Sequence, residues 1–389
     1  MSQTAAKNGS MPARTHDSAY THALDLMTKH PFIDGHNDLP WVVRNAGKSD
    51  LVAYDLAKLH PETDTDIPRL RAGHVATQVL AAFLPTSVTH PATVTAEQID
   101  LILRIEDRHA DVFHPVRTPA DVAVAQGLGK IGSLMSVEST VGLEGSLAPL
   151  RLWHRLGVRL VTLCHNESLP WIDSATDKPN GSHEGLSRFG RDLVGEMNRV
   201  GLIVDLAHVA PHAMHKVLDI AAAPIVISHS NVTTLCPHPR NTPDDVLERI
   251  PANGGMIMAT FVPEFLNPAS LEGVRWLKDQ WGKNKPGSTS ADYRKAREDC
   301  IAGWDRDGIA YFCEHLDYLR KAVGDDHIGI GSDFYGGPNP PGLEDASKFP
   351  DLIAELVRRQ WSDAALVKLM GGNFVRVWTE VLEAAARVA

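Results

Sequence analysis

Short apolar runs in this chain repeatedly end in a histidine or a carboxylate, and this pattern limits the folds that the chain can adopt. Apolar runs of this length, bounded by turns, are typical of parallel strands that are buried on both faces. In a (β/α)8 barrel the carboxyl ends of all strands meet at one rim, and enzymes with this fold have their active sites there. Six such runs end in His36-Asn37-Asp38, Glu138, His165, His208, His229 and Asp333.

Eight strands are predicted, and helical periodicity fills most of the segments between them. The predicted strands are 31–36, 74–83, 130–137, 158–164, 201–207, 224–229, 255–261 and 327–333. The predicted helices include 96–111, 148–156, 187–200, 211–222 and 244–250, with two more near 350–360 and 362–386 outside the barrel. The alternation indicates an α/β fold, a (β/α)8 TIM barrel of the metal-dependent hydrolase type. We expect residues 1–18 to form a mobile arm and residues 19–389 a single catalytic domain.

Long loops follow several of the predicted strand ends. Residues 167–184 follow His165, residues 263–291 follow the seventh strand, and residues 336–342 follow Asp333. Loops at the carboxyl rim of a barrel commonly form substrate walls or lids. We therefore expect these insertions to border the site.

Composition excludes several classes of partner. The 389 residues are 43% apolar and 22% charged, which is typical of a globular protein. A net charge of −10 argues against a nucleic-acid partner. No apolar stretch reaches the ~18 residues of a membrane span, and residues 1–20 lack the apolar core of a signal peptide. Four cysteines without a C-x-x-C pair favour reduced thiols and a cytoplasmic location, with disulfides as the alternative.

Five of the strand-end residues have the chemistry of metal ligands. His36 and Asp38 stand two residues apart, so an extended chain places both on one face. His208 and His229 end neighbouring predicted strands, and neutral imidazole is the commonest zinc ligand. A buried carboxylate at Glu138 needs a cation; an arginine is one candidate, and a pair of metal ions is favoured by the surrounding histidines. The alternative for each histidine is an ordinary hydrogen-bonded rim residue.

Three further residues have the chemistry of catalysis or substrate binding. Asp333 is a candidate metal ligand or general base for a metal-activated water. His165 is suited to polarise a substrate carbonyl or to donate to its oxyanion. Arg240 follows the sixth strand, and its planar guanidinium pairs with a carboxylate through two hydrogen bonds. The structural alternatives are a turn-capping aspartate, a packed histidine and a solvated arginine.

The chain resembles the membrane (renal) dipeptidase family of binuclear zinc peptidases. The motifs that carry the resemblance lie in order between about residues 30 and 380. They are Asp34-Gly35-His36-Asn37-Asp38-Leu39-Pro40, Thr162-Leu163-Cys164-His165-Asn166, Asp205-Leu206-Ala207-His208-Val209, Ser228-His229-Ser230, Arg240-Asn241 with Pro243-Asp244-Asp245, Gly331-Ser332-Asp333-Phe334, and Gly342-Leu343-Glu344-Asp345 with Lys348-Phe349-Pro350-Asp351-Leu352.

The resemblance implies a (β/α)8 barrel that binds two Zn²⁺ ions per chain, although similar sites accept other divalent metals. His36 and Asp38 would hold one ion. His208 and His229 would hold the other, and Glu138 would bridge the two. Dimers are common in the family, so a homodimer is expected.

The resemblance also implies three roles toward substrate. His165 would contact the scissile carbonyl or the tetrahedral intermediate. Arg240 would bind the C-terminal carboxylate of a dipeptide. Asp333 would carry a proton from the bridging water to the leaving amine.

Two positions depart from the family's pattern. Ser139-Thr140 follow Glu138, where glycine is usual, and Tyr335 stands two residues after Asp333, where a second aspartate is common. We expect these changes to alter substrate choice more than metal binding.

The leading hypothesis is a zinc dipeptidase that cleaves small dipeptides with a free C-terminal carboxylate through a metal-bridging hydroxide. We expect it to tolerate D-residues at the C-terminal position. The alternative is a specialised metal-dependent amide or lactam hydrolase of secondary metabolism, for example one that cleaves Cys-Gly in a glutathione conjugate. A third hypothesis, a barrel that binds metal without turnover, is disfavoured because every candidate ligand and Asp333 are present.

Overall fold

The computed structural model describes residues 17–61, 63–179, 184–270, 301, 304, 307–335 and 339–388. The described strands form one parallel sheet with the order β1-β2-β4-β5-β6-β7-β8-β9, and β3 pairs with β4. Their bounds are β1 (Phe32–Asp34), β2 (Val75–Phe83), β3 (Phe113–Val116), β4 (Ile131–Glu138), β5 (Val158–Thr162), β6 (Ile203–Asp205), β7 (Val226–Ile227), β8 (Met256–Ala259) and β9 (Ile328–Ile330).

Backbone hydrogen bonds beyond the ends of β1 and β9 bring the two outer strands of this order together. The amide of Gly35 donates to the carbonyl of Ile330 at 3.0 Å, and the amide of Asp333 donates to the carbonyl of His36 at 3.2 Å. The eight strands therefore form a nearly closed barrel, which confirms the predicted fold. Each predicted strand is present, most of them shorter than expected.

The strand β3 is absent from the sequence prediction. Its four residues, Phe113–Val116, include His114 and Pro115, so the segment shows no continuous apolar run. Proline is tolerated where a strand lacks a partner on one side. Among the described strands β3 pairs with β4 alone, along the first half of β4.

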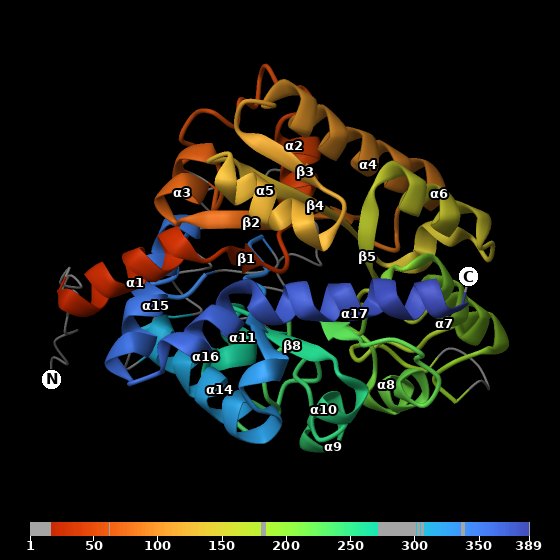
Figure 1. Cartoon of the computed structure of the whole chain (residues 1–389). Coiled ribbons are helices and arrows are strands. Elements are labelled where there is room, and N and C mark those ends of the chain that lie inside the picture. Colours follow the sequence, from red (N-terminus) through yellow and green to blue (C-terminus); the bar gives the residue numbers. More distant parts are fainter. Residues whose placement is uncertain are drawn as a thin grey trace, which may run out of the picture.

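Helices surround the barrel (Figure 1). Those before β6 are α1 (Ser18–Lys29), α2 (Leu39–Ala46), α3 (Ile67–Ala72), α4 (Pro91–Arg108), α5 (Pro119–Gly127), α6 (Ala148–Leu156) and α7 (Arg188–Val200). Those after β6 are α8 (Pro211–Leu218), α9 (Asp244–Leu247), α10 (Ile250–Asn253), α11 (Pro263–Leu266), α14 (Gly308–Val323), α15 (Phe349–Arg358), α16 (Asp363–Val367) and α17 (Asn373–Val388). None of the described helices is both long and apolar enough to cross a membrane.

Local signals set the helix ends. The Ser187 side chain accepts a hydrogen bond from the Gly190 amide and caps the start of α7, and Gly201 ends that helix with a φ of 80°. Asp17 caps α1 in the same way and also pairs with Arg358 at 3.0 Å. The helix begins at Ser18, so residues 17 and 18 are folded. The rest of the predicted mobile arm, residues 1–16, lies outside the described part of the chain.

The helix α17 closes the amino-terminal end of the barrel, where it crosses in front of the strands (Figure 1). Its apolar residues belong to the same core cluster as inward-facing strand residues such as Leu160 and Met256. Those helix residues are Phe374, Val377, Trp378 and Val381. Both final helices were expected outside the barrel; α17 packs there across one end of the strands, a position that the sequence analysis did not specify. The carboxyl ends of the strands, where the predicted ligands lie, are at the opposite end of the barrel.

Candidate metal centre

The carboxyl ends of the strands bring the predicted ligands together. Glu138 is the last residue of β4, and its partner in the register of β5 is Thr162, which is in turn level with Asp205 of β6. His36 and Asp38 follow β1, and His208 and His229 follow β6 and β7. The candidate ligand atoms form three groups in which all atoms lie within 4.8 Å of one another: His36 with Asp38 and Glu138, Glu138 with His208 and His229, and His36 with His229 and Asp333.

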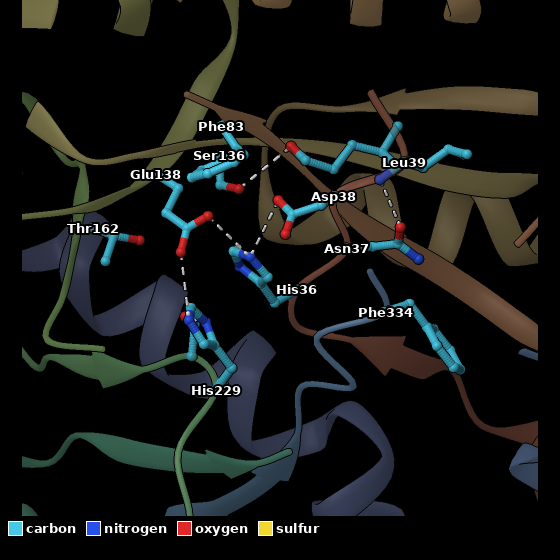
Figure 2. A network of polar contacts seen from close by, with 12 residues as sticks. His36, Asn37, Asp38, Leu39, Phe83, Ser136, Glu138, Thr162, His229 and Phe334 are labelled. Carbon is cyan, nitrogen blue, oxygen red and sulfur yellow. Dashed lines mark hydrogen bonds and ion pairs between the residues drawn. The ribbon is translucent and has the colours of Figure 1, made fainter. Parts of the chain in front are cut away.

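Glu138 stands at the centre of these groups. Its Oε1 lies 3.0 Å from His208 Nε2 and 3.5 Å from His229 Nε2. Its Oε2 lies 3.4 Å from His36 Nε2, and that nitrogen lies 3.6 Å from Asp38 Oδ1. Figure 2 shows the Glu138 carboxylate pointing between the rings of His36 and His229. Each carboxylate oxygen therefore faces a different set of ligands.

These residues fit a pair of divalent ions. All of them are buried, yet several of their polar atoms have no hydrogen-bond partner among the described residues: both ring nitrogens of His36, Asp38 Oδ1, Glu138 Oε2 and His229 Nε2. Buried polar atoms are normally satisfied because leaving them unpaired is costly. Two ligands bound tetrahedrally to Zn²⁺ at about 2.1 Å stand roughly 3.4 Å apart. The three distances from Glu138 to the histidines and the distance from His36 to Asp38, 3.0–3.6 Å, are close to that spacing, so the atoms are arranged as metal ligands would be.

The electrostatics of the histidines agree with this interpretation. Burial lowers the pKa of His208 well below its usual range, and the positive charge of Arg240 adds to the effect. Burial acts on the pKa of His229 in the same direction, with His36 as the next cause. Burial also opposes protonation of His36, but the carboxylates of Glu138 and Asp38 outweigh it and raise its pKa. Neutral imidazole is the form that binds metal, so His208 and His229 are already in the ligating state.

Asp333 follows β9 and faces the same space. Burial raises its pKa to about 8, and the carboxylates of Asp38 and Glu138 add to the rise while His36 and Arg240 oppose it. Its φ of 61° lies in the left-handed region, as does the φ of 69° at His208. Such backbone costs ~1–3 kcal/mol for a residue other than glycine, and it is found where a functional side chain must be aimed.

His165 and Arg240 border the metal ligands. The His165 ring lies between those of Phe83 and His208, with centroid distances of 4.8 Å and 4.3 Å. Burial, followed by the charge of Arg240, lowers the pKa of His165 to about 3, so the ring is neutral. The buried Arg240 guanidinium lies over the Phe265 ring at 5.3 Å and makes one long hydrogen bond, 3.5 Å, to the His229 carbonyl. A buried cation therefore stands beside the neutral histidines.

The described part of the 167–184 insertion lies against the site. The Ser174 hydroxyl donates to the carbonyl of His165 at 2.7 Å, and the amide of Ala175 donates to the carbonyl of His208 at 2.7 Å. The Trp171 indole donates to Thr140 Oγ1 at 2.8 Å. The insertion thus holds the backbone of two site histidines. Most of the 263–291 insertion, and residues 336–338 of the third loop, lie outside the described residues.

The two departures from the family pattern have structural roles. Ser139 has a φ of 79°, which explains why glycine suits that position. Thr140 donates to the Leu163 carbonyl at 2.5 Å while it accepts from the Trp171 indole, so it joins β5 to the insertion. The Tyr335 hydroxyl accepts from the amides of Thr65 and Asp64 at 2.8 Å and 3.2 Å. It therefore anchors that segment.

Two aspartates near the site, Asp34 and Asp205, were not among the predicted site residues. Both carboxylates are fully buried at the ends of β1 and β6, close to the ligands, and each binds a serine of a neighbouring strand. Burial raises the pKa of Asp34 to about 6, although hydrogen bonds from Ser332 and Gln78 oppose the rise. The signal that would have found them is an aspartate inside an otherwise apolar strand, since such a charge needs specific partners.

Comparison with known proteins identifies the family. A model of the membrane dipeptidase family, peptidase family M19, matches residues 20–389. Dipeptidase tcpJ of Claviceps purpurea is 34% identical, over 94% of this chain and 85% of the relative. Dipeptidase verJ of Clonostachys rogersoniana is 33% identical, over 96% of this chain and 89% of the relative.

A solved structure gives the same result. The crystal structure of the probable dipeptidase PvdM from Pseudomonas aeruginosa matches with a TM-score of 0.80 at 25% identity, over 94% of this chain and 99% of that one. The resemblance seen in the sequence motifs is thereby confirmed. The chain belongs to the membrane dipeptidase family, peptidase family M19, and is a metal-dependent dipeptidase.

Proposed function

We propose that this chain is a two-zinc dipeptidase that cleaves small dipeptides with a free C-terminal carboxylate. The observation that carries the proposal is the position of Glu138, whose two oxygens face two separate sets of ligand atoms at 3.0–3.5 Å. A carboxylate between two ions about 3.5–4 Å apart is the arrangement that two-metal hydrolases use. His36 and Asp38 would complete one site, and His208 and His229 the other.

When bound, the two ions supply a water activated for attack at neutral pH and polarise the scissile carbonyl. The protein supplies the proton transfer. Asp333 would accept a proton at its carboxylate and deliver it to the leaving amine, which needs a group that titrates near the working pH. Its pKa of about 8 in the metal-free site supports this role, and bound cations would lower that value.

His165 and Arg240 would position the substrate. Neutral His165 carries one ring N–H, which would donate to the carbonyl oxygen as negative charge develops there. Arg240 would pair with the dipeptide's C-terminal carboxylate, and its burial beside Phe265 makes that charge pair strong. Neither contact involves the C-terminal side chain of the substrate. We therefore propose that a D-residue is tolerated at that position.

The proposal is tested with a matched panel of substrates and enzyme of known zinc content. The panel contains L-Ala-L-Ala, L-Ala-D-Ala, L-Leu-Gly, the C-terminal amide of each, and a Cys-Gly S-conjugate. We expect turnover of the free dipeptides, including the D-residue substrate, and a fall in kcat/KM of about 100-fold or more for the amides, because two charge-assisted hydrogen bonds are lost.

Two outcomes would redirect the proposal. Equal rates on acids and amides would remove Arg240 from carboxylate recognition. Turnover of the conjugate alone would favour the specialised amide hydrolase. The homodimer and the cytoplasmic location expected from the sequence stay predictions.

A further inference from the structure

Two buried aspartates hold serines of neighbouring strands in the same way. Asp205 at the end of β6 accepts from the Ser228 amide at 2.9 Å and from the Ser228 hydroxyl at 2.6 Å. Asp34 at the end of β1 accepts from the Ser332 amide at 2.8 Å and from the Ser332 hydroxyl at 2.7 Å. Each serine directly precedes a candidate site residue, His229 or Asp333. The same arrangement, an aspartate that accepts from both the amide and the hydroxyl of a serine, therefore occurs twice at the carboxyl rim of the barrel.

The two serines differ in what else their hydroxyls contact. The Ser228 hydroxyl lies 2.8 Å from Nδ1 of the His229 ring. The Ser332 hydroxyl donates to Asp34 and lies 3.1 Å from the backbone carbonyl of His36, and among the described residues it makes no hydrogen bond to a histidine ring. The first serine can influence a candidate ligand directly, whereas the second serves as an internal comparison.

The Ser228 hydroxyl has a single hydrogen, and the group that accepts it determines the direction of the contact with His229. Asp205 accepts four hydrogen bonds: Oδ1 from the amides of Ala207 and Ser228, and Oδ2 from the hydroxyls of Thr162 and Ser228. An ionised carboxylate has about four acceptor positions, so all are used. The single hydroxyl hydrogen of Ser228 is thereby committed to Asp205. Toward His229 the Ser228 oxygen can act only as an acceptor.

The consequence is a fixed tautomer. His229 must carry its proton on Nδ1, which leaves a lone pair on Nε2. That nitrogen is buried, has no hydrogen-bond partner in the described part of the chain and lies 3.5 Å from Glu138 Oε1. A lone pair and a carboxylate oxygen at this distance repel each other unless a cation lies between them. The ring therefore presents the correct atom to an ion shared with Glu138.

We propose that Ser228, held by Asp205, is a positioning residue that sets the tautomer and orientation of His229 for metal binding. The inference rests on the proposed function, because it takes His229 as a ligand. Asp205 also binds Thr162 of β5, so the same carboxylate joins the ends of three neighbouring strands. A partner that orients a ligand in this manner typically contributes 10–100-fold to metal affinity.

The test compares Ser228→Ala with two matched variants. Ser332→Ala removes the equivalent hydroxyl from Asp34, and Thr162→Val removes another hydroxyl from Asp205; neither touches the His229 ring. Zn²⁺ affinity is measured by chelator competition on the full chain, and the visible spectrum of the Co²⁺-loaded protein reports the coordination. We expect Ser228→Ala to bind one of the two ions about 10–100-fold more weakly with an altered spectrum. Both controls should stay within about threefold of wild type.

The possible results distinguish a failure of this inference from a failure of the proposed function. Two tightly bound ions in wild type and in Ser228→Ala would overturn the inference alone, as would equal weakening in all three variants. A wild-type chain that binds no metal would overturn the proposed function as well.

Neutron diffraction of the wild-type holoenzyme provides a check that needs no variant. A hydrogen on His229 Nδ1 directed at Ser228, with the ion on Nε2, supports the inference. The reverse arrangement overturns it.

Discussion

The buried Asp333 carboxyl should make the metal-free protein less stable as the pH rises. Its pKa in the folded chain is about 8, against an ordinary value of 3.8, because the carboxyl is buried near other carboxylates. The folded state therefore holds this proton more tightly than the unfolded chain does. The stabilisation is complete below about pH 4 and is lost as the pH rises through 8. Between pH 6 and 9, these two pKa values correspond to a fall of about 2–3 kcal/mol in the free energy of unfolding. Each pH unit between the two pKa values changes that free energy by about 1.4 kcal/mol.

The measurement is urea unfolding of the chelator-treated protein at intervals between pH 6 and 9, followed by tryptophan fluorescence. Asp333→Asn carries no titrating group there, so its stability should fall by about 2–3 kcal/mol less than that of wild type. Asp34 and Glu138 also have raised pKa values, and the difference between the two curves separates their contribution. Asp192→Asn, at an exposed position on α7, should retain the wild-type slope. Parallel curves for wild type and Asp333→Asn would refute the reasoning.

Three further predictions concern single side chains. Asp333→Asn should keep both metal ions by elemental analysis and lose about 10²–10⁴ in kcat, because proton transfer is removed; near-normal turnover would exclude the proposed role. Arg240→Gln should lower kcat/KM for free dipeptides by about 10–100-fold and leave the slow cleavage of their C-terminal amides unchanged; an equal loss on both would point to a structural role. Thr140→Val should lose about 1–3 kcal/mol in urea unfolding, because the Trp171 indole is left without its acceptor, whereas Thr140→Ser should be close to wild type; matching losses in the two variants would contradict this account.

The strand ends were predictable because they are local features of the sequence. An apolar run followed by histidine, as at His208 and His229, gives both the strand and the residue that leaves it. In a parallel barrel the carboxyl ends of all strands lie at one rim. Identifying each strand end in the sequence was therefore enough to predict that these distant residues lie together. The structure indeed groups Glu138 with both histidines.

The features that were not predicted depend on contacts between distant segments. The helical period of 373–388 is visible in the sequence, but its position across the barrel end depends on apolar residues of several strands. The partnership of Asp205 with Ser228 depends on the register between β6 and β7, in which Asp205 is level with Val226. The strand β3 is short and contains Pro115, so its existence depends on pairing with β4. Local patterns do not encode these relationships.

The central claim is that Glu138 lies between two metal ions in an active dipeptidase. The most direct test is elemental analysis of metal per chain on the same sample whose hydrolysis of L-Ala-D-Ala and L-Leu-Gly is measured. We predict close to two zinc ions per chain, turnover of both dipeptides, and loss of activity when the metal is removed. A chain without bound metal, or one whose turnover survives complete removal of metal, would contradict it.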